Sequence, residues 1–91
     1  MLDELKDLYK MKQQAQQLQD ELGNKRVSGK SRDGRYSITM NGNQEVLDVF
    51  VPSGDLVKTD VEEGIKEAFH DARQKIEALL RDKMTGLMSN S

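Results

Sequence analysis

The sequence predicts an α+β protein in which a long helix, a three-stranded antiparallel sheet and a second long helix follow one another. Apolar residues recur at helical spacing over residues 3–22 and again over 59–87. Between these stretches the pattern alternates with a period of two and is interrupted by Asp-Gly and Asn-Gly. The 91 residues fit one domain over 1–91. Helices this long should extend beyond so small a sheet.

The first helix is expected from Asp3 to Leu22. Its apolar seam steps by three and four residues and comprises Leu8, Met11, Ala15, Leu18 and Leu22. Gly23 and Asn24 follow and indicate the end of the helix, because both residues tolerate a left-handed backbone. The seam could pair with a second chain as a coiled coil or pack on this chain's own second helix, and both alternatives stay open.

Three short strands are expected between the helices. The first opens at Val27 and ends at the turn 31–34, the second covers 36–40, and the third covers 45–51. The second turn is expected at Asn41-Gly42, with a positive φ at Gly42.

The third strand is largely apolar on both faces. Simple alternation places Leu47, Val49 and Val51 on one face and Val46, Asp48 and Phe50 on the other. A strand of this kind should be covered on both sides, and in a sheet of three strands the second cover should come from a partner subunit. We therefore expect a homodimer.

The second helix is expected to begin near Thr59, where residues 59–62 match a capping box. A continuous apolar stripe follows, and Gly86 is the expected terminator. The helix should span roughly 40 Å against about 20 Å for a strand.

Composition limits the possible locations and partners. The chain has no cysteine, which fits a reducing cytosol. The acidic, amphipathic first ten residues do not resemble a signal peptide, and no apolar run approaches the roughly 18 residues of a membrane span. The net charge of −2 argues against strong nucleic-acid binding, but it is unevenly distributed: residues 25–35 carry +4 and residues 45–63 carry −5.

Catalysis has little support in the sequence. His70 is the one histidine, and its position near the apolar stripe favours a solvated or packing role. Gly29, Gly34 and Gly42 are interpreted as turn glycines rather than a phosphate-binding loop. We expect no enzyme activity, no cofactor, no metal and no small-molecule substrate.

Basic residues on the two helices are the candidate DNA-binding site. An antiparallel helix pair would bring them to one projecting end, and they comprise Lys6, Lys10, Lys12, Lys75, Arg81 and Lys83. On the residues alone, ordinary solvation of helix faces is the simpler explanation. The denser cluster from Lys25 to Arg35 is a second candidate, although hairpin tips are commonly basic for solubility.

The chain resembles the YbaB/EbfC family of small bacterial nucleoid-associated proteins over nearly its whole length. The resemblance lies in the order and spacing of KQQAQQLQ at 12–19, VSGKS at 27–31, Asp33-Gly34, ITMNG at 38–42, AFHDARQKIE at 68–77 and RDKM at 81–84. It implies an α-β-β-β-α protomer whose three-stranded sheet is flanked by two long helices, and a tweezer-like homodimer. It also implies duplex DNA binding with little sequence specificity, nucleoid compaction, and an influence on transcription or recombination in the cytoplasm. The resemblance implies neither enzyme activity nor a membrane partner.

Two segments depart from the family pattern. Gly54 and Asp55 stand where leucines are usual, and residues 88–91 lack a longer extension rich in glycine and proline. The resemblance therefore carries no expectation of contacts made by a tail. The alternative function is a helical adaptor or holdase-like protein without DNA binding, although the first helix is short for a prefoldin-like arm.

Overall fold

The computed structural model describes residues 2–89. Its elements are α1 (Leu2–Gly23), β1 (Arg26–Lys30), β2 (Ser37–Asn41), β3 (Val46–Phe50) and α2 (Lys58–Ser89). The predicted order of helix, three antiparallel strands and helix is confirmed. The last two residues of the short tail, Asn90 and Ser91, lie outside the described residues.

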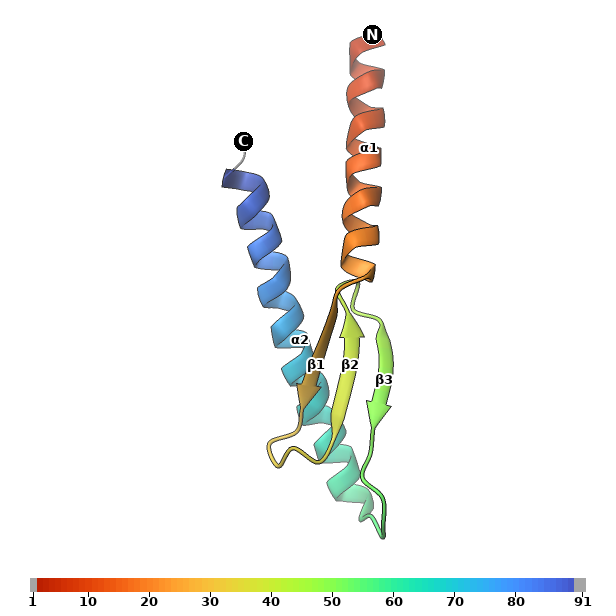
Figure 1. Cartoon of the computed structure of the whole chain (residues 1–91), viewed down its shortest axis with the longest axis vertical. Coiled ribbons are helices and arrows are strands. Elements are labelled where there is room, and N and C mark those ends of the chain that lie inside the picture. The colour runs from red at the N-terminus through yellow and green to blue at the C-terminus, as the bar shows by residue number, and fades with distance from the viewer. Residues whose placement is uncertain (1, 90–91) are drawn as a thin grey trace.

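The protomer is far longer than a compact protein of its size. It measures 65 × 21 × 17 Å, and its radius of gyration is 18.2 Å against about 12 Å for a compact domain. Its accessible surface is 7337 Å², against about 5,400 Å² for a compact monomer. Figure 1 shows the reason: α1 continues beyond the end of the sheet, and α2 extends beyond that same end at a diverging angle.

One helix alone covers the sheet. The core joins Tyr36, Ile38 and Met40 of the β2 segment to Ala68, Ala72 and Ile76 of α2. Small residues let the helix approach β1 closely, because a Cβ added at Gly29 would clash with backbone atoms of Ala68 and Ala72. α2 therefore packs closely against β1 and β2, whereas β3 lies outside this packed core.

The first turn has the expected Asp-Gly chemistry. Gly34 has a φ of 75°, which glycine adopts at little cost. The carboxylate of Asp33 accepts hydrogen bonds from the Ser31 hydroxyl at 2.7 Å and from the Arg35 amide at 3.1 Å. These hydrogen bonds hold the pKa of Asp33 below its usual value, and the one from Ser31 has the largest effect. The side chains of the turn therefore fix its shape.

The second turn differs from the prediction in one respect. The positive φ lies at Gln44 (66°) and not at Gly42, because the loop is three residues long and places its left-handed residue last. Gly42 serves a different purpose. Its amide donates to the carbonyl of Leu22 at 2.8 Å, and an added Cβ would lie 2.7 Å from that oxygen. Gly42 thus allows α1 to end directly against the turn.

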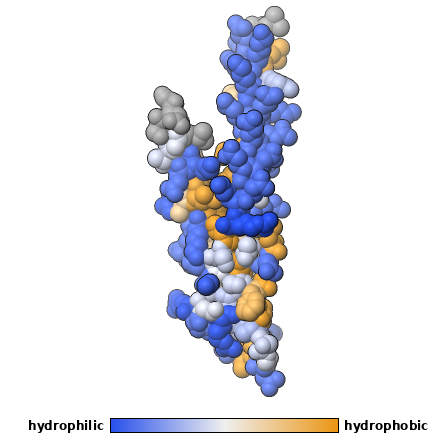
Figure 2. All heavy atoms as spheres, in the orientation of Figure 1, coloured by the Kyte–Doolittle hydropathy of each residue, from blue (hydrophilic) through white to orange (hydrophobic). Residues whose placement is uncertain are grey.

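The third strand also differs from simple alternation. A register shift at Thr39/Met40 pairs Met40 with Val46, so Val46 shares the face of Val49. All five residues of β3 are exposed in the single chain, so the expected cover on both sides is absent from the protomer. Figure 2 shows hydrophobic surface along β3 and in the fork between the two helices.

The helix ends bear out the prediction for α1 and for the start of α2, but not for the end of α2. α1 stops at Gly23 as expected, and α2 begins at Lys58, one residue before Thr59. Gly86 does not terminate α2, which continues to Ser89; a glycine is tolerated within a helix at a cost of about 1 kcal/mol. The α1 seam does not pack along α2, because Leu5, Leu8 and Met11 are 62–64% exposed.

Candidate nucleic-acid interface

The N-terminal half of α1 carries three of the candidate cations. Lys6, Lys10 and Lys12 are exposed, and none of their amino groups has a carboxylate partner within residues 2–89. Three acids, Asp3, Glu4 and Asp7, occupy the same stretch, so its formal charge is zero. The three lysines are therefore free to reach an anion, but they generate no strong local field.

The three candidates on α2 lie in different surroundings. Arg81 is exposed and has no carboxylate partner in the described part of the chain. Lys83 pairs with Glu21, which lies in the last turn of α1, at 3.3 Å. Lys75 does not lie on the projecting end, because its amino group donates to the Ser28 carbonyl of β1 at 2.6 Å. The predicted gathering of all six cations at one end is therefore incomplete.

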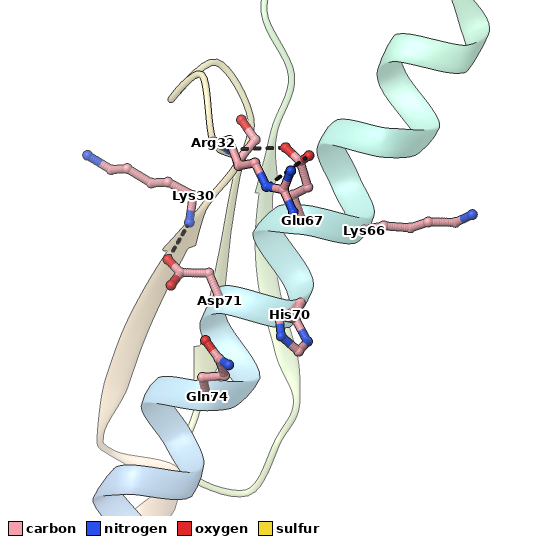
Figure 3. A pocket seen from close by; sticks show the side chains of 8 residues that line it. Lys30, Arg32, Lys66, Glu67, His70, Asp71 and Gln74 are labelled. Atoms are coloured by element: carbon pink, nitrogen blue, oxygen red, sulfur yellow. Dashed lines mark hydrogen bonds and ion pairs between the residues drawn. The ribbon is translucent and has the colours of Figure 1, made fainter.

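Lys75 belongs to a row of α2 side chains that we call the edge clamp: Glu67, Asp71 and Lys75. Residues four apart share a helix face, and this face lies along the outer edge of β1 (Figure 3). The carboxylate of Glu67 accepts from the Arg32 amide at 3.1 Å, and that of Asp71 accepts from the Lys30 amide at 2.9 Å. The edge clamp therefore satisfies backbone groups that a fourth strand would otherwise pair.

The electrostatics of Asp71 follow from the edge clamp. The hydrogen bond from the Lys30 amide, and then the one from the Lys75 amino group, lower the pKa of Asp71 below its usual value. Lys75 lies 3.2 Å from this carboxylate. The sequence contains the signal for this row, two acids and a base at intervals of four, but nothing in the sequence shows which strand edge they face.

An open hollow lies beside the edge clamp. His70 and Gln74 line it, and the side chains of Lys30 and Lys66 extend from it in opposite directions (Figure 3). The His70 side chain is exposed, in line with the solvated role expected for it. No group of three His, Cys, Asp or Glu side chains among residues 2–89 could hold a metal ion.

The β1–β2 hairpin carries the densest free positive charge. Lys25, Arg26, Lys30 and Arg35 are exposed and lack a carboxylate partner within the described residues. Arg32 differs, because its Nε lies 3.7 Å from a carboxylate oxygen of Glu67. Sequence reasoning found this cluster but could not tell which of its members were paired.

Neither helix, over the described residues, is long and apolar enough to cross a membrane. The geometry defines a class of elongated proteins. In this class one helix backs a small sheet, two helices project from one end of the sheet, and free cations lie at both ends of the molecule. Comparison with known proteins identifies the family. A model of the YbaB/EbfC DNA-binding family matches residues 1–91, and the chain belongs to that family.

Curated relatives agree with this assignment. A nucleoid-associated protein of Prochlorococcus marinus is 33% identical over 89 residues, covering 96% of this chain and 77% of that protein. A nucleoid-associated protein of Coxiella burnetii is 35% identical over 83 residues, covering 88% and 74%. The crystal structure of an uncharacterized Helicobacter pylori protein matches with a TM-score of 0.75 at 21% identity, covering 89% of this chain and 88% of that one. That structure supports the fold.

Proposed function

We propose that this protein is a nucleoid-associated protein that binds duplex DNA with little sequence specificity. The observation that carries the proposal is the match of the DNA-binding family over residues 1–91. The relatives named as nucleoid-associated proteins support a place on the bacterial nucleoid, in the cytoplasm. Binding there would compact DNA and influence transcription or recombination. The chemistry needed is charge neutralisation, for which no enzyme activity is required.

The projecting helix ends are the proposed contact. Lys6, Lys10, Lys12 and Arg81 have free charged groups on long side chains, which suit phosphates better than base edges. Lys75 and Lys83 already bind oxygen atoms of this chain and contribute less. Such contacts position a protein on duplex DNA without reading its sequence.

A homodimer formed through β3 is the proposed assembly. Its five residues are exposed, and the apolar ones among Val46–Val51 are 38–60% exposed. The protomer has about 2,000 Å² more surface than a compact monomer, which is comparable to what each partner buries in a large obligate dimer. A second copy would cover this surface, and the joined sheets would carry two pairs of projecting helices.

The test is an electrophoretic mobility shift assay on several unrelated duplexes across a salt series. We expect similar affinity for each duplex, and a fall of log K with log salt of roughly 0.9 per neutralised phosphate. Charge reversal at Lys10 and Arg81 should weaken binding to all duplexes alike. An absence of binding to any duplex at low salt would overturn the proposed function.

An adaptor or holdase without DNA binding is the second candidate. The observation that favours it is the exposed α1 seam at Leu5, Leu8 and Met11, because exposed apolar stripes bind other chains. An aggregation assay with an unfolded client protein distinguishes the two functions. Suppression of aggregation without any duplex binding would favour the second candidate.

A further inference from the structure

The positive charge of the chain is concentrated away from its projecting helices. The β1–β2 hairpin segment 25–35 carries +4. Because the whole chain carries −2, all other residues together carry −6. The N-terminal stretch of α1 with the candidate lysines is neutral. The hairpin is thus the strongest cationic surface on a chain that is otherwise acidic, and the proposed contact of the helix ends leaves it unexplained.

The hairpin presents its charge on an open sheet face. Pairing across β1 and β2 places Arg26, Ser28 and Lys30 on the face opposite α2, together with Ser37 and Thr39. No helix covers this face of the sheet in Figure 1, and over the hairpin Figure 2 shows hydrophilic residues among residues of intermediate hydropathy. Two long cations flank small hydroxyl side chains there, so a phosphate backbone could approach without obstruction.

The structure keeps the charged groups of the hairpin available. Backbone atoms of Lys30 are held by the edge clamp, while its amino group extends away from α2 (Figure 3). Asp33 is the one acid in the segment 25–35, and its carboxylate is already engaged by Ser31 and Arg35 within the turn. The hairpin therefore offers free cations on a backbone that is held at the turn end of β1.

Two carboxylates lie at the junction between the hairpin and the projecting helices. Asp20 and Glu45 line one shallow hollow at the junction of α1 with the sheet. Lys10 lies in α1 on one side of this junction and Lys30 lies at the end of β1 on the other; the rise per residue of a helix and of a strand puts them roughly 30 Å apart. A single duplex running along the whole protomer would have to pass these two carboxylates, which disfavours one continuous contact surface.

We infer that the β1–β2 hairpin, through Arg26 and Lys30 on its open face and Arg35 next to its turn, is a second duplex-binding surface, so that one protein assembly bridges two DNA duplexes. The inference rests on the proposed function, because bridging requires that the helix ends bind the first duplex. Two separated backbone contacts would hold two segments of DNA together. This supplies a physical route from weak, non-specific binding to compaction.

Bridging is tested with one duplex fixed on beads and a second, fluorescent duplex in solution. Wild-type protein should retain the fluorescent duplex on the beads, and retention should fall as salt rises. The hairpin variant Lys30→Gln with Arg35→Gln should lose most of this retention, whereas its affinity for a single duplex in a mobility shift assay should fall by no more than about threefold.

Two further variants with the same change in charge complete the design. The helix variant Lys10→Gln with Lys12→Gln should weaken both single-duplex binding and bridging. The control variant Lys58→Gln with Arg73→Gln removes cations already paired with Glu62 and Glu77, and it should change neither measurement.

The possible outcomes separate the inference from the proposed function. If the hairpin variant bridges as well as wild type, or loses single-duplex binding as fully as bridging, the second surface does not exist and the inference is overturned. If wild-type protein binds single duplexes but never bridges them, the inference fails and the proposed function stands. If wild-type protein binds no duplex, the proposed function itself fails.

Discussion

The two edge strands of the sheet, β1 and β3, differ in whether their outer sides are covered. At the β1 edge, side chains of α2 take the place of a neighbouring strand, with Asp71 accepting from the Lys30 amide and Lys75 donating to the Ser28 carbonyl. At the β3 edge, apolar residues such as Val49 and Phe50 lie exposed, and the core of α2 packs elsewhere. An open, apolar edge invites pairing with another chain, whereas a polar, occupied edge prevents it. The chain thus closes its β1 edge by itself, whereas its β3 edge stays exposed and is the edge assigned to the proposed homodimer.

The two edges should also respond to different perturbations. The β1 edge depends on close backbone packing and on charged hydrogen bonds, so it should be sensitive to added volume and to acid. The β3 edge depends on apolar surface, so it should be sensitive to an introduced charge and to protein concentration.

The largest effect is expected from Gly29→Val on β1. The new side chain would overlap the backbone of α2 at Ala68 and Ala72, which cannot move without breaking the core. We expect a loss of more than about 3 kcal/mol of unfolding free energy, enough to leave much of the chain unfolded. Circular dichroism during urea denaturation measures it. Ser28→Val, on the open face of the same strand, is the matched control and should stay near wild type.

The next effect concerns β3. Val49→Asp should place a charge in the proposed subunit contact and dissociate the dimer, while Val57→Asp, also an exposed valine but outside the sheet, should not. Analytical ultracentrifugation should give about twice the 10.3 kDa chain mass for wild type and for Val57→Asp. A monomeric wild type, or a dimeric Val49→Asp, would contradict the assignment of this edge.

A smaller effect is expected from Asp71→Asn in the edge clamp. The folded state lowers the pKa of Asp71 below 3.8, so its stabilising contribution is complete above the unfolded value and is lost as pH falls through the folded value. The variant should be about 1 kcal/mol less stable at pH 7, a modest amount because the carboxylate is partly exposed. The difference from wild type should shrink below about pH 4.

Urea denaturation of both proteins between pH 2.5 and 7 measures this prediction. Asp82→Asn, on the exposed stretch of α2, removes the same charge without touching β1 and is the control. A difference between Asp71→Asn and wild type that stays constant down to pH 2.5 would show that the Asp71 carboxylate does not hold the edge.

The smallest effect is expected at Gln44, the residue that leads into β3. It adopts a φ of 66°, which costs glycine less than glutamine, so Gln44→Gly should stabilise the chain by about 0.5 kcal/mol. Gln16→Gly, inside α1, should have the opposite sign at about 1 kcal/mol. Thermal denaturation followed by circular dichroism compares the two. A loss of stability in Gln44→Gly would mean that the side chain matters more than the backbone at this turn.

The order of elements could be predicted from the sequence, because it depends on local spacing. The end of α1 at Gly23 and the turn at Gly34 both follow from residues within a few positions. The register shift that turns Val46 toward the face of Val49 could not be predicted, because it depends on how two strands pair and not on alternation within one. The positive φ predicted for Gly42 was wrong for a similar reason. Glycine is needed there because the end of α1 lies against the turn, which local sequence does not show.

The candidate site was predicted less completely than the fold. The sequence identified which residues are cationic but not which of them are already bound. Lys75 lies on the same helix as Arg81, yet it binds the edge of β1 while Arg81 stays free. Lys83 finds its partner, Glu21, 62 positions away in the chain. Distances of this kind are set by the angle between the two helices, which no local pattern encodes.

That angle is set at one small joint. The end of α1 is held by the Gly42 amide on the Leu22 carbonyl and by the Asn43 side-chain amide on the Gln19 carbonyl at 3.0 Å. α1 has 22 residues, and all but its last turn extends beyond the joint as a lever of roughly 28 Å. A rotation of about 10° at the joint would displace the far end by about 5 Å. A shift of a few tenths of an ångström near Gly42 would therefore produce a much larger change in the distance between the tips of the two helices.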